Sequence, residues 1–336
     1  MTLLPLVLSF FGSCLASCLV TWLAILGCRR FGVYDVPNER SSHVAKTPRG
    51  GGVGIYLVVL IAIAIFWRTG SLDPALAASL LIGGAIVVAI GLADDLRGLS
   101  VLVRLPAHLG ASALASWWLL QPVLTYGPVL NALLLAFCTL FVAWSLNIYN
   151  FMDGIDGIAG VQGAFAGLAL ILFAGAFGFL GASLLGFSLC GACLGFLVWN
   201  WHPARIFMGD AGSGFLGFAI GCFALASAVR SPAFFCTWLI ILGVFTADSS
   251  VTLVTRTLRG QKFYQAHRLH AYQHLAKRLV SHGKVSGGVV AICALWLLPW
   301  AWLSVSRQDY AVPILTAALA PLLFAAIRLR AGREAL

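Results

Sequence analysis

Stretches of about 20 predominantly apolar residues recur along the whole chain, and this repetition restricts the fold more than any other feature. A helix of that length crosses the hydrocarbon core of a bilayer, which is about 30 Å thick. Only 10% of the 336 residues are charged, whereas a soluble domain has about a quarter. The sequence therefore predicts an all-α, polytopic helical membrane protein that forms a single domain over residues 1–336.

We identify eleven apolar stretches as transmembrane helices. They are residues 3–27, 52–67, 75–93, 105–120, 129–146, 158–176, 180–200, 213–229, 233–254, 285–304 and 311–327. Arg29 and Arg30 follow the first stretch, and no basic residue precedes it. This order is the reverse of that in a cleavable signal peptide, so we expect an anchoring helix with its N-terminus outside the cytoplasm.

Charged residues are distributed unequally between the two sets of loops that these helices define. All but three of the 21 Lys and Arg residues fall in one set, and the exceptions are Arg68, Arg230 and Arg307. Loops rich in Lys and Arg usually lie in the cytoplasm. All but two of the 11 acidic residues lie on or beside the same side, the exceptions being Asp73 and Asp309. We therefore expect the functional groups to lie at the cytoplasmic face.

The interiors of the helices are almost free of charge, and residues 157–204 contain no Asp, Glu, Lys or Arg. Ion-coupled transporters usually carry ionisable side chains near the middle of the membrane, so this pattern favours a membrane enzyme over a transporter. The nine cysteines are scattered through the apolar stretches, which indicates packing roles and not disulfides or a zinc site.

The segment NIYNFMDGIDGIAG, residues 147–160, contains Asn147, Asn150, Asp153 and Asp156 at three-residue intervals. Side chains three residues apart are neighbours on a helix. Their amide and carboxylate oxygens are ligands that suit Mg²⁺. The alternative is helix capping and turn formation, which accounts for one or two such residues but not for four. We interpret the segment as functional.

Two further segments carry acids at the ends of apolar stretches. In GLADDLRGLSVLVR, Asp94 and Asp95 stand at the C-terminal end of a helix, where the helix dipole disfavours anions. They do not cap that helix, and the alternative to a functional role is the start of a solvated loop. In RIFMGDAGSGFLG, Asp210 lies between glycines just before an apolar stretch, where a helix N-cap is the alternative.

Two segments combine basic residues with glycine or histidine. In DVPNERSSHVAKTPRGGGVG, Lys46 and Arg49 precede three glycines whose backbone N–H groups would suit a phosphate, and the alternative is an ordinary positive-inside loop with a hinge. In AHRLHAYQHLAKR, we expect His267, His270 and His274 on one helical face. An amphipathic interfacial helix is the alternative. A zinc site there would lack a nearby cysteine or acid, so we interpret these histidines and Arg268 as anion binders.

These segments share one side of the membrane, and together they resemble the signature segments of a known family. SSHVAKTPRGGG, GLADDLRG, NIYNFMDGIDGIAG, FMGDAGSGFLG and HRLHAYQHL are similar, in the same order, to segments of the polyprenyl-phosphate N-acetylhexosamine-1-phosphate transferases, glycosyltransferase family 4. The form of HRLHAYQHL most resembles the bacterial undecaprenyl-phosphate transferases that initiate O-antigen or related surface glycans.

The resemblance implies transfer of an N-acetylhexosamine 1-phosphate from a UDP-sugar to undecaprenyl phosphate, with release of UMP. It implies that Asn150 and Asp210 hold Mg²⁺, with Mn²⁺ as a substitute. The catalytic acids that we carry over are Asp94, Asp95, Asp153 and Asp156. The substrate-binding residues that we expect are Lys46, Arg49, Arg104, Asn147, His267, Arg268, His270 and His274.

The partners follow from the same resemblance. They are the UDP-N-acetylhexosamine, undecaprenyl phosphate, membrane lipid and a second copy of the chain in a homodimer, and no nucleic acid is expected. The expected location is the bacterial inner membrane. Two alternatives stay open: the phospho-N-acetylmuramoyl-pentapeptide transferase of peptidoglycan synthesis, and, from a different class, a transporter of lipid-linked substrates. The sugar also stays open among N-acetylglucosamine, N-acetylfucosamine and N-acetylquinovosamine.

Overall fold

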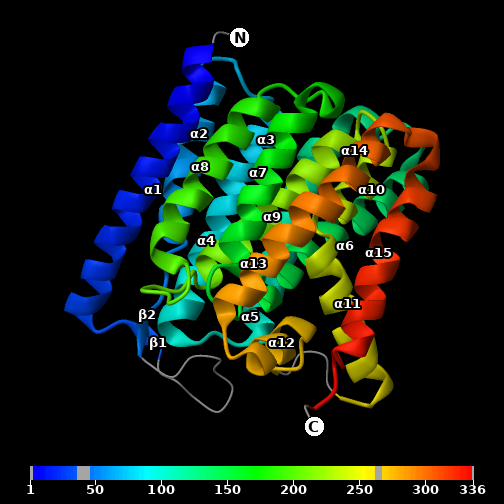
Figure 1. Ribbon diagram of the computed structural model, residues 1–336. Coiled ribbons are helices and arrows are strands. Elements are labelled where there is room, and N and C mark those ends of the chain that lie inside the picture. The colour runs from blue at the N-terminus through cyan, green and yellow to red at the C-terminus, as the bar shows by residue number, and fades with distance from the viewer. Residues whose placement is uncertain (1–2, 36–45, 262–266, 335–336) are drawn as a thin grey trace.

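Helices dominate the computed structural model, which describes residues 3–35, 46–261 and 267–334 (Figure 1). The uninterrupted long helices are α1 (Leu3–Phe31), α2 (Val53–Arg68), α5 (Val101–Leu120), α6 (Pro128–Met152), α7 (Ile158–Phe177), α8 (Ala182–Asn200), α9 (Asp210–Ala228) and α15 (Ala311–Arg328). Over the described residues, strands are limited to β1 (Tyr34–Asp35) and β2 (Thr47–Pro48), which pair antiparallel with Tyr34 opposite Pro48.

The remaining helices are interrupted or short. Helix α3 (Pro74–Ala78) continues through the π-helical turn η1 (Ser79–Gly83) into α4 (Gly84–Arg97), and α13 (His282–Ile292) continues through η3 (Cys293–Leu297) into α14 (Leu298–Ser306). Helices α10 (Ala233–Ile241) and α11 (Gly243–Leu258) are bent by 83° at Leu242. The short elements are α12 (Ala271–Leu279), η2 (Gln121–Val123) and η4 (Gln308–Tyr310).

Each of the eleven predicted apolar stretches coincides with one of these helices or helix pairs. Among the described residues, eight helices are long and apolar enough to cross a membrane, and the bent α10–α11 pair counts as a ninth. The two remaining stretches form α2, which has only 16 residues, and α5, which includes Arg104 and His108. The prediction of an all-α, polytopic membrane protein is confirmed.

The bend between α10 and α11 corrects the prediction of one continuous helix over residues 233–254. A break in a helix frees backbone carbonyl groups, which must find other donors where water is scarce. The side-chain amide of Gln162, which is buried on α7, donates from Nε2 to the carbonyl of Ile241 at 3.0 Å. The structure thus provides a donor at the bend itself.

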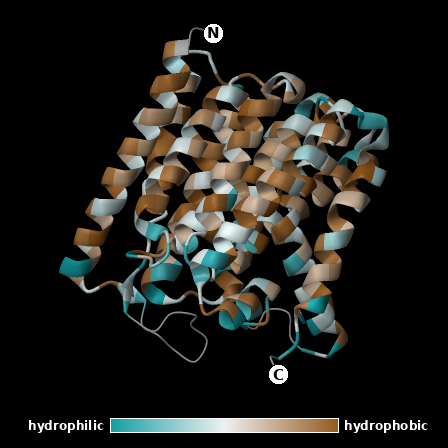
Figure 2. Ribbon diagram, viewed as in Figure 1, coloured by the Kyte–Doolittle hydropathy of each residue, from teal (hydrophilic) through white to brown (hydrophobic). Residues whose placement is uncertain are grey.

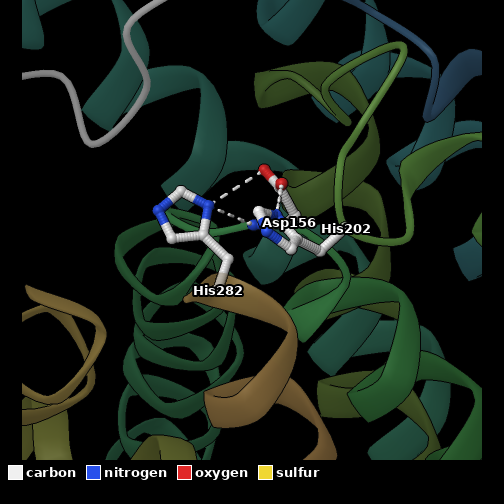
Figure 3. A group of neighbouring side chains, drawn as sticks. All are labelled: Asp156, His202 and His282. Carbon is white, nitrogen blue, oxygen red and sulfur yellow. Dashed lines mark hydrogen bonds and ion pairs between the residues drawn. The ribbon is translucent and has the colours of Figure 1, made fainter. Parts of the chain in front are cut away.

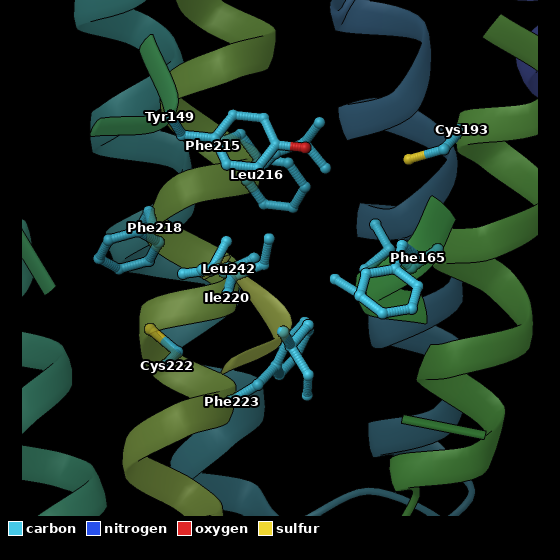
Figure 4. Packing of buried hydrophobic residues seen from close by; sticks show 14 of the residues in the cluster. Tyr149, Phe165, Cys193, Phe215, Leu216, Phe218, Ile220, Cys222, Phe223 and Leu242 are labelled. Carbon is cyan, nitrogen blue, oxygen red and sulfur yellow. The ribbon is translucent and has the colours of Figure 1, made fainter. Parts of the chain in front are cut away.

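Helix α9 lies in the centre of the bundle (Figure 1), and 89% of its apolar stretch is buried. Figure 4 shows part of this core, where Phe215 of α9 lies close to Tyr149 of α6, and Phe218 and Phe223 follow along α9. Small residues allow neighbouring helices to approach closely. A Cβ atom on Gly91 of α4 would lie 2.5 Å from the Cα atom of Ala211, so α4 and α9 touch backbone to backbone.

Helix α1 packs on α8 by the same device. Cβ atoms added to Gly191 and Gly195 of α8 would collide with the carbonyl oxygens of Phe10 and Cys14, respectively. The nine cysteines are all free, and Cys193 and Cys222 are fully buried among apolar residues. The packing role predicted for the cysteines therefore holds for the buried ones, Cys138, Cys193, Cys222 and Cys293.

We expect the Gly195→Leu variant to lose thermal stability, because its side chain has no space against the backbone of α1. Overpacking of this kind typically costs about 1–3 kcal/mol. Thermal denaturation of the purified protein in detergent measures the effect. Gly175→Leu on α7 is the matched control, since a Cβ atom there has no neighbour within 4 Å. Equal melting temperatures of the two variants would contradict the close α1–α8 contact.

Polar segments gather at one end of the bundle, the lower end in Figure 1. The ends of α4, α6, α8 and α15 lie there, together with the starts of α5 and α9, both strands and α12. Hydrophilic residues concentrate at this end, and a smaller group lies at the opposite end (Figure 2). The described N-terminal end of α1 and the C-terminal end of α15 lie at opposite ends. Described parts of all five polar segments singled out in the sequence therefore lie at the same end of the bundle.

Candidate active site

Two arginines and three aspartates form an ion-pair network, which we call the arginine–carboxylate cluster. Arg49 contacts Asp95 at 2.8 Å through Nε and Asp210 at 2.6 Å through Nη2. Arg104 contacts Asp210 at 3.2 Å through Nη1, and the same nitrogen is bonded to Asp94. Residues that are up to 161 positions apart in the chain are thus linked by shared charge contacts.

Asp95 also determines where α9 begins. Its carboxylate accepts hydrogen bonds from the backbone N–H groups of Asp210 at 2.9 Å and Ala211 at 3.3 Å. Gly209, with φ of 79°, leaves room for this carboxylate, because a Cβ atom there would lie 2.6 Å from Asp95 Oδ2. The interpretation of Asp210 as the N-cap of α9 is therefore wrong: Asp95 satisfies the helix N-terminus, and the Asp210 side chain faces the arginines.

The three glycines after Arg49 do not offer their N–H groups to a phosphate, contrary to our expectation. Gly50 and Gly51 donate to the carbonyl of Phe207 at 3.2 and 2.9 Å, and Gly52 donates to that of Met208 at 2.9 Å. Glycine is needed there for close approach, since a Cβ atom on Gly52 would lie 2.5 Å from the Cα atom of Gly212. The segment positions Arg49 beside Asp210. Lys46 is exposed, and residues 36–45 of the same loop lie outside the described part of the chain.

The asparagines of α6 point toward the same region. The Asn150 side-chain oxygen accepts a hydrogen bond from Ser213 Oγ at 2.7 Å, one turn into α9 from Asp210. Asn147 lies one turn earlier and donates to the carbonyl of Ala143 at 2.7 Å. Helix α6 ends at Met152, so the three-residue spacing is helical only for the two asparagines.

Asp153 follows the end of α6 and lies near the arginine–carboxylate cluster. Enclosure by the surrounding chain raises the pKa of its carboxyl well above the usual value, and the charges of Asp210 and Asp95 raise it further, against the opposing effect of Arg49. The charges of three cluster residues thus act on Asp153 directly. This carboxyl belongs to the same electrostatic unit although it comes from a different loop.

The charges of this unit fit a divalent cation. The arginine–carboxylate cluster sets three carboxyl groups against two guanidinium groups, and a bound cation would also favour ionisation of Asp153, whose pKa is raised. Carboxylate and amide oxygens are the ligands that Mg²⁺ prefers. Burial of an excess of negative charge without a compensating cation is costly. The oxygens of Asp210 and Asn150 therefore suit Mg²⁺ in their chemistry, and Ser213, which bonds Asn150, lies one turn after Asp210 on α9.

Asp156 lies in a separate group with two histidines (Figure 3). Its carboxylate is 2.7 Å from His202 Nδ1 and 3.1 Å from His282 Nδ1, and it accepts a hydrogen bond from the backbone N–H of Ala204 at 3.2 Å. Burial raises the pKa of Asp156, but the hydrogen bonds from His282 and His202 outweigh burial and lower it overall. In the described contacts, Asp156 does not join the ion pairs of Asp94, Asp95 and Asp210.

The histidine segment begins its helix later than we predicted. Helix α12 begins at Ala271, His270 is the residue before it, and His267 lies in the preceding loop. The three predicted histidines therefore do not lie on one helical face. His274 is buried on α12, and Arg268 is half-buried before it.

A buried acid holds α12 in place. Asp248 of α11 accepts hydrogen bonds from the backbone N–H groups of Ala271 and Tyr272 at 2.9 Å each and contacts His270 Nδ1 at 3.1 Å. The Tyr272 hydroxyl donates to the carbonyl of Phe151 at 3.1 Å. Gly154 makes room for this hydroxyl. The histidine segment is thus fastened to the loop that carries Asp153.

The chain is similar in sequence to a known family and to several named proteins. A family model described as glycosyl transferase family 4 matches residues 77–228. A decaprenyl-phosphate N-acetylglucosaminephosphotransferase of Mycolicibacterium smegmatis is 29% identical over 312 residues, which cover 82% of this chain and 75% of that protein. A probable undecaprenyl-phosphate N-acetylglucosaminyl 1-phosphate transferase of Bacillus subtilis is 28% identical over 294 residues, which cover 83% of this chain and 80% of that protein.

A third relative has a higher percentage identity over a comparable length. A phospho-N-acetylmuramoyl-pentapeptide-transferase of Moorella thermoacetica is 32% identical over 300 residues, which cover 76% of this chain and 86% of that protein. The chain belongs to glycosyl transferase family 4. The resemblance to polyprenyl-phosphate N-acetylhexosamine-1-phosphate transferases that the motifs indicate is confirmed by the family match and the named relatives.

The match to glycosyl transferase family 4 covers three of the five polar segments. Residues 77–228 include Asp94, Asp95, Asn150 and Asp210. Arg49 and the histidine segment lie outside that range, yet Arg49 is bonded to Asp95 and Asp210. The arginine–carboxylate cluster therefore includes at least one residue, Arg49, from outside the matched region.

Four residues at this end of the family 4 glycosyl transferase were not among the predicted site residues. Ser213 holds Asn150, Asp248 holds α12, and His202 and His282 hold Asp156. Asp248 carried a signal, because a carboxylate inside an apolar stretch needs a partner. Ser213, His202 and His282 belong to no recognisable motif, so the sequence did not indicate a functional role for them.

The pH dependence of stability tests the environment of His267. Burial, together with the electrostatic effect of the neighbouring His270 and Arg256, lowers the pKa of His267 to about 3. An exposed histidine has a pKa of about 6.5. Between these values the unfolded chain binds a proton that the folded chain does not, so stability decreases as the pH falls below about 6.5. His267 is therefore neutral at neutral pH and would contact a substrate as a hydrogen-bonding group.

We expect the melting temperature of the wild-type protein to fall more between neutral pH and about pH 5 than that of the His267→Gln variant. Other groups, including the buried His274, whose pKa is also lowered by burial, contribute equally to both proteins and cancel in the difference. Thermal denaturation across this pH range measures it. Parallel pH profiles for the two proteins would show that His267 is solvated.

Proposed function

We propose that this chain transfers an N-acetylhexosamine 1-phosphate from a UDP-sugar to undecaprenyl phosphate and releases UMP. The observation that supports this most strongly is the arginine–carboxylate cluster, because Arg49, Arg104, Asp94 and Asp210 are drawn from three segments into one ion-pair network. The relatives named as polyprenyl-phosphate N-acetylglucosamine phosphotransferases support the same reaction class.

The charges suit a reaction between two anions. The donor is a diphosphate, and the acceptor is a phosphate monoester whose second pKa is about 6, so it is largely a dianion at neutral pH. Arg49 and Arg104 reduce the repulsion between the two substrates and orient their phosphates. Asn150 and Asp210 hold Mg²⁺, or Mn²⁺ as its substitute. When bound, this ion neutralises charge on the diphosphate and helps to align it for displacement.

In the proposed step, an oxygen of the lipid phosphate attacks the phosphorus that bears the sugar. A new phosphorus–oxygen bond forms, the bond from that phosphorus to the bridging oxygen breaks, and UMP leaves with the bonding pair. The dianionic acceptor needs little help from a base. Asp95 is occupied by the α9 N-terminus and Arg49. Asp94 is likewise bonded by Arg104 and by the backbone N–H of Leu99. In this proposal Asp94 or Asp95 positions the acceptor or removes a residual proton, and Asp153 is the third catalytic acid.

The other predicted residues contribute from the periphery of this site. Asn147 lines the nucleotide and metal region one turn before Asn150 on the same helix. Lys46, His267, Arg268, His270 and His274 bind the phosphate or the sugar in this proposal. Asp156 acts through the loop of residues 153–157, because its carboxylate is occupied by His202 and His282.

The membrane arrangement serves the same chemistry. The proposal includes eleven transmembrane helices in the bacterial inner membrane, with the N-terminus outside and the site at the cytoplasmic face, as the distribution of Lys and Arg favours. The prenyl acceptor is insoluble in water and must arrive from within the bilayer, whereas the UDP-sugar arrives from the cytosol. A site at the ends of several helices meets both. A homodimer is part of this proposal.

The biological role that we propose is the first step of O-antigen or related surface-glycan synthesis. The alternative is the phospho-N-acetylmuramoyl-pentapeptide transfer that names the Moorella thermoacetica relative. The histidine segment HRLHAYQHL favours the first role, by its resemblance to that branch. A lipid-linked transporter is less well supported, because the ionisable residues cluster at one end of the bundle.

The test is UMP release by the purified chain in detergent with undecaprenyl phosphate and one UDP-sugar at a time. The donors are the UDP derivatives of N-acetylglucosamine, N-acetylfucosamine and N-acetylquinovosamine, and UDP-N-acetylmuramoyl-pentapeptide. We expect Mg²⁺-dependent release with one of the first three and a lipid product whose mass includes both phosphates. Release only with the pentapeptide donor would move the chain to the alternative role. No release with any donor would overturn the proposal.

A further inference from the structure

Three side chains with metal-ligating atoms meet outside the arginine–carboxylate cluster (Figure 3). Asp156 comes from the loop before α7, His202 from the loop before α9, and His282 from the first residue of α13. One ligand atom from each residue lies within 4.8 Å of the others. The residues are up to 126 positions apart in the chain, so their meeting is a product of the fold.

We propose that Asp156, His202 and His282 bind a divalent transition-metal ion of the Zn²⁺ class, at a site distinct from that of Asn150 and Asp210. Two imidazole nitrogens and one carboxylate are a donor set that suits Zn²⁺, whereas Mg²⁺ prefers oxygen ligands alone. Three protein ligands leave a fourth position for water. The His202 side chain is 39% exposed, so water reaches this position.

The spacing of the ligand atoms fits such an ion. In a tetrahedral zinc site, metal–ligand distances of about 2.0–2.1 Å place the ligand atoms about 3.3 Å apart. The two imidazole nitrogens lie 2.7 and 3.1 Å from the Asp156 oxygens. All three ligand atoms lie within 4.8 Å of one another, so side-chain rotations of the two histidines would bring them to the spacing of such a site.

The same three side chains are linked without a metal ion by hydrogen bonds from the imidazole Nδ1–H groups of His202 and His282 to the Asp156 carboxylate, at 2.7 and 3.1 Å. Binding of a metal ion would replace these protons, so Zn²⁺ affinity should rise with pH.

Outer contacts hold the ligands in place, as is usual around metal sites. Ala204 donates its N–H to Asp156 Oδ2 at 3.2 Å, and Ser286 Oγ donates to the Asp156 carbonyl at 2.6 Å. The Ser281 side chain caps α13 by accepting from the N–H of Lys284 at 3.3 Å. The site joins the loop that carries Asp153 to the loop that leads to Asp210, so an ion there would stiffen both.

The experiment measures Zn²⁺ binding by the full chain, purified in detergent without a polyhistidine tag and freed of metal by a chelator. Titration takes place in excess Mg²⁺, which occupies the oxygen-ligand site. We expect one Zn²⁺ ion per chain, and visible absorption bands when Co²⁺ replaces it. His202→Asn and His282→Asn should each weaken binding by about tenfold or more. Lys284→Ala is the matched control, because its exposed side chain lies in the same turn of α13, and it should bind like wild type.

Two results would overturn the proposal: wild type that retains no more Zn²⁺ than the His202→Asn, His282→Asn double variant, or single variants that bind as wild type does. His202 is the more exposed ligand, so His202→Asn carries the test even where His282→Asn does not fold. Zn²⁺ binding is measured without donor or acceptor. Its outcome is therefore independent of the proposed transferase reaction.

Discussion

The Asp210→Asn variant is expected to fold normally and to lose about a hundredfold to a thousandfold in UMP release. Asparagine keeps the volume of aspartate and leaves the backbone N–H bonded to Asp95. The amide removes the negative charge that Arg49 contacts at 2.6 Å and Arg104 at 3.2 Å. It also weakens the proposed metal ligand. The loss should therefore appear in the turnover number and in the dependence on Mg²⁺ concentration, measured with purified enzyme.

The matched control for Asp210→Asn is Asp73→Asn at the opposite end of the same bundle. Asp73 accepts a hydrogen bond from the N–H of Leu76 at 3.0 Å and caps α3. Its replacement should cost about 1 kcal/mol of stability or less, the typical value of a helix cap, and leave turnover unchanged. Wild-type turnover in Asp210→Asn would remove Asp210 from the metal and phosphate roles.

The apolar stretches predicted the helices well because membrane thickness fixes their length. The bend at Leu242 escaped prediction, since residues 233–254 read as one apolar stretch. Its cause is tertiary, because Gln162 of α7 stabilises the exposed carbonyl of Ile241. The start of α12 at Ala271 was not predicted for a similar reason. Histidine spacing predicts one helical face, but Asp248 of α11 bonds the backbone at Ala271 and starts the helix there.

The sequence predicted that the acidic residues lie at the same end of the bundle, because the loops alternate between the two sides of the membrane. It did not predict which residues they contact. Charge patterns showed that Asp94, Asp95 and Asp210 face the same end, but not that Asp95 caps the helix that Asp210 begins. That contact depends on the close approach of α4 and α9. Gly91 appears in the sequence as one of 36 glycines, and nothing local distinguishes it from the rest.

The Gly91→Ala variant tests whether close helix packing assembles the site. The added methyl group would lie 2.5 Å from the Cα and N atoms of Ala211, about 1 Å inside the optimal separation of such atoms. Helices α4 and α9 must separate, and the Asp94–Asp95 pair then moves away from Asp210. A misplacement of about 1 Å costs about a hundredfold in rate, and overpacking costs about 1–3 kcal/mol in stability. We expect both losses.

Gly110→Ala on α5 is the control for Gly91→Ala, because it makes the same Gly-to-Ala change at a position without a packing neighbour. A Cβ atom on Gly110 has no neighbour within 4 Å, and alanine is favoured over glycine inside a helix by about 0.5–1 kcal/mol. This control should keep its turnover and melt no lower than wild type. If Gly91→Ala also kept full turnover, the distance between α4 and α9 would not limit the reaction. The pairing of Asp95 with the α9 N-terminus would then be a feature of stability alone, because no catalytic step would depend on it.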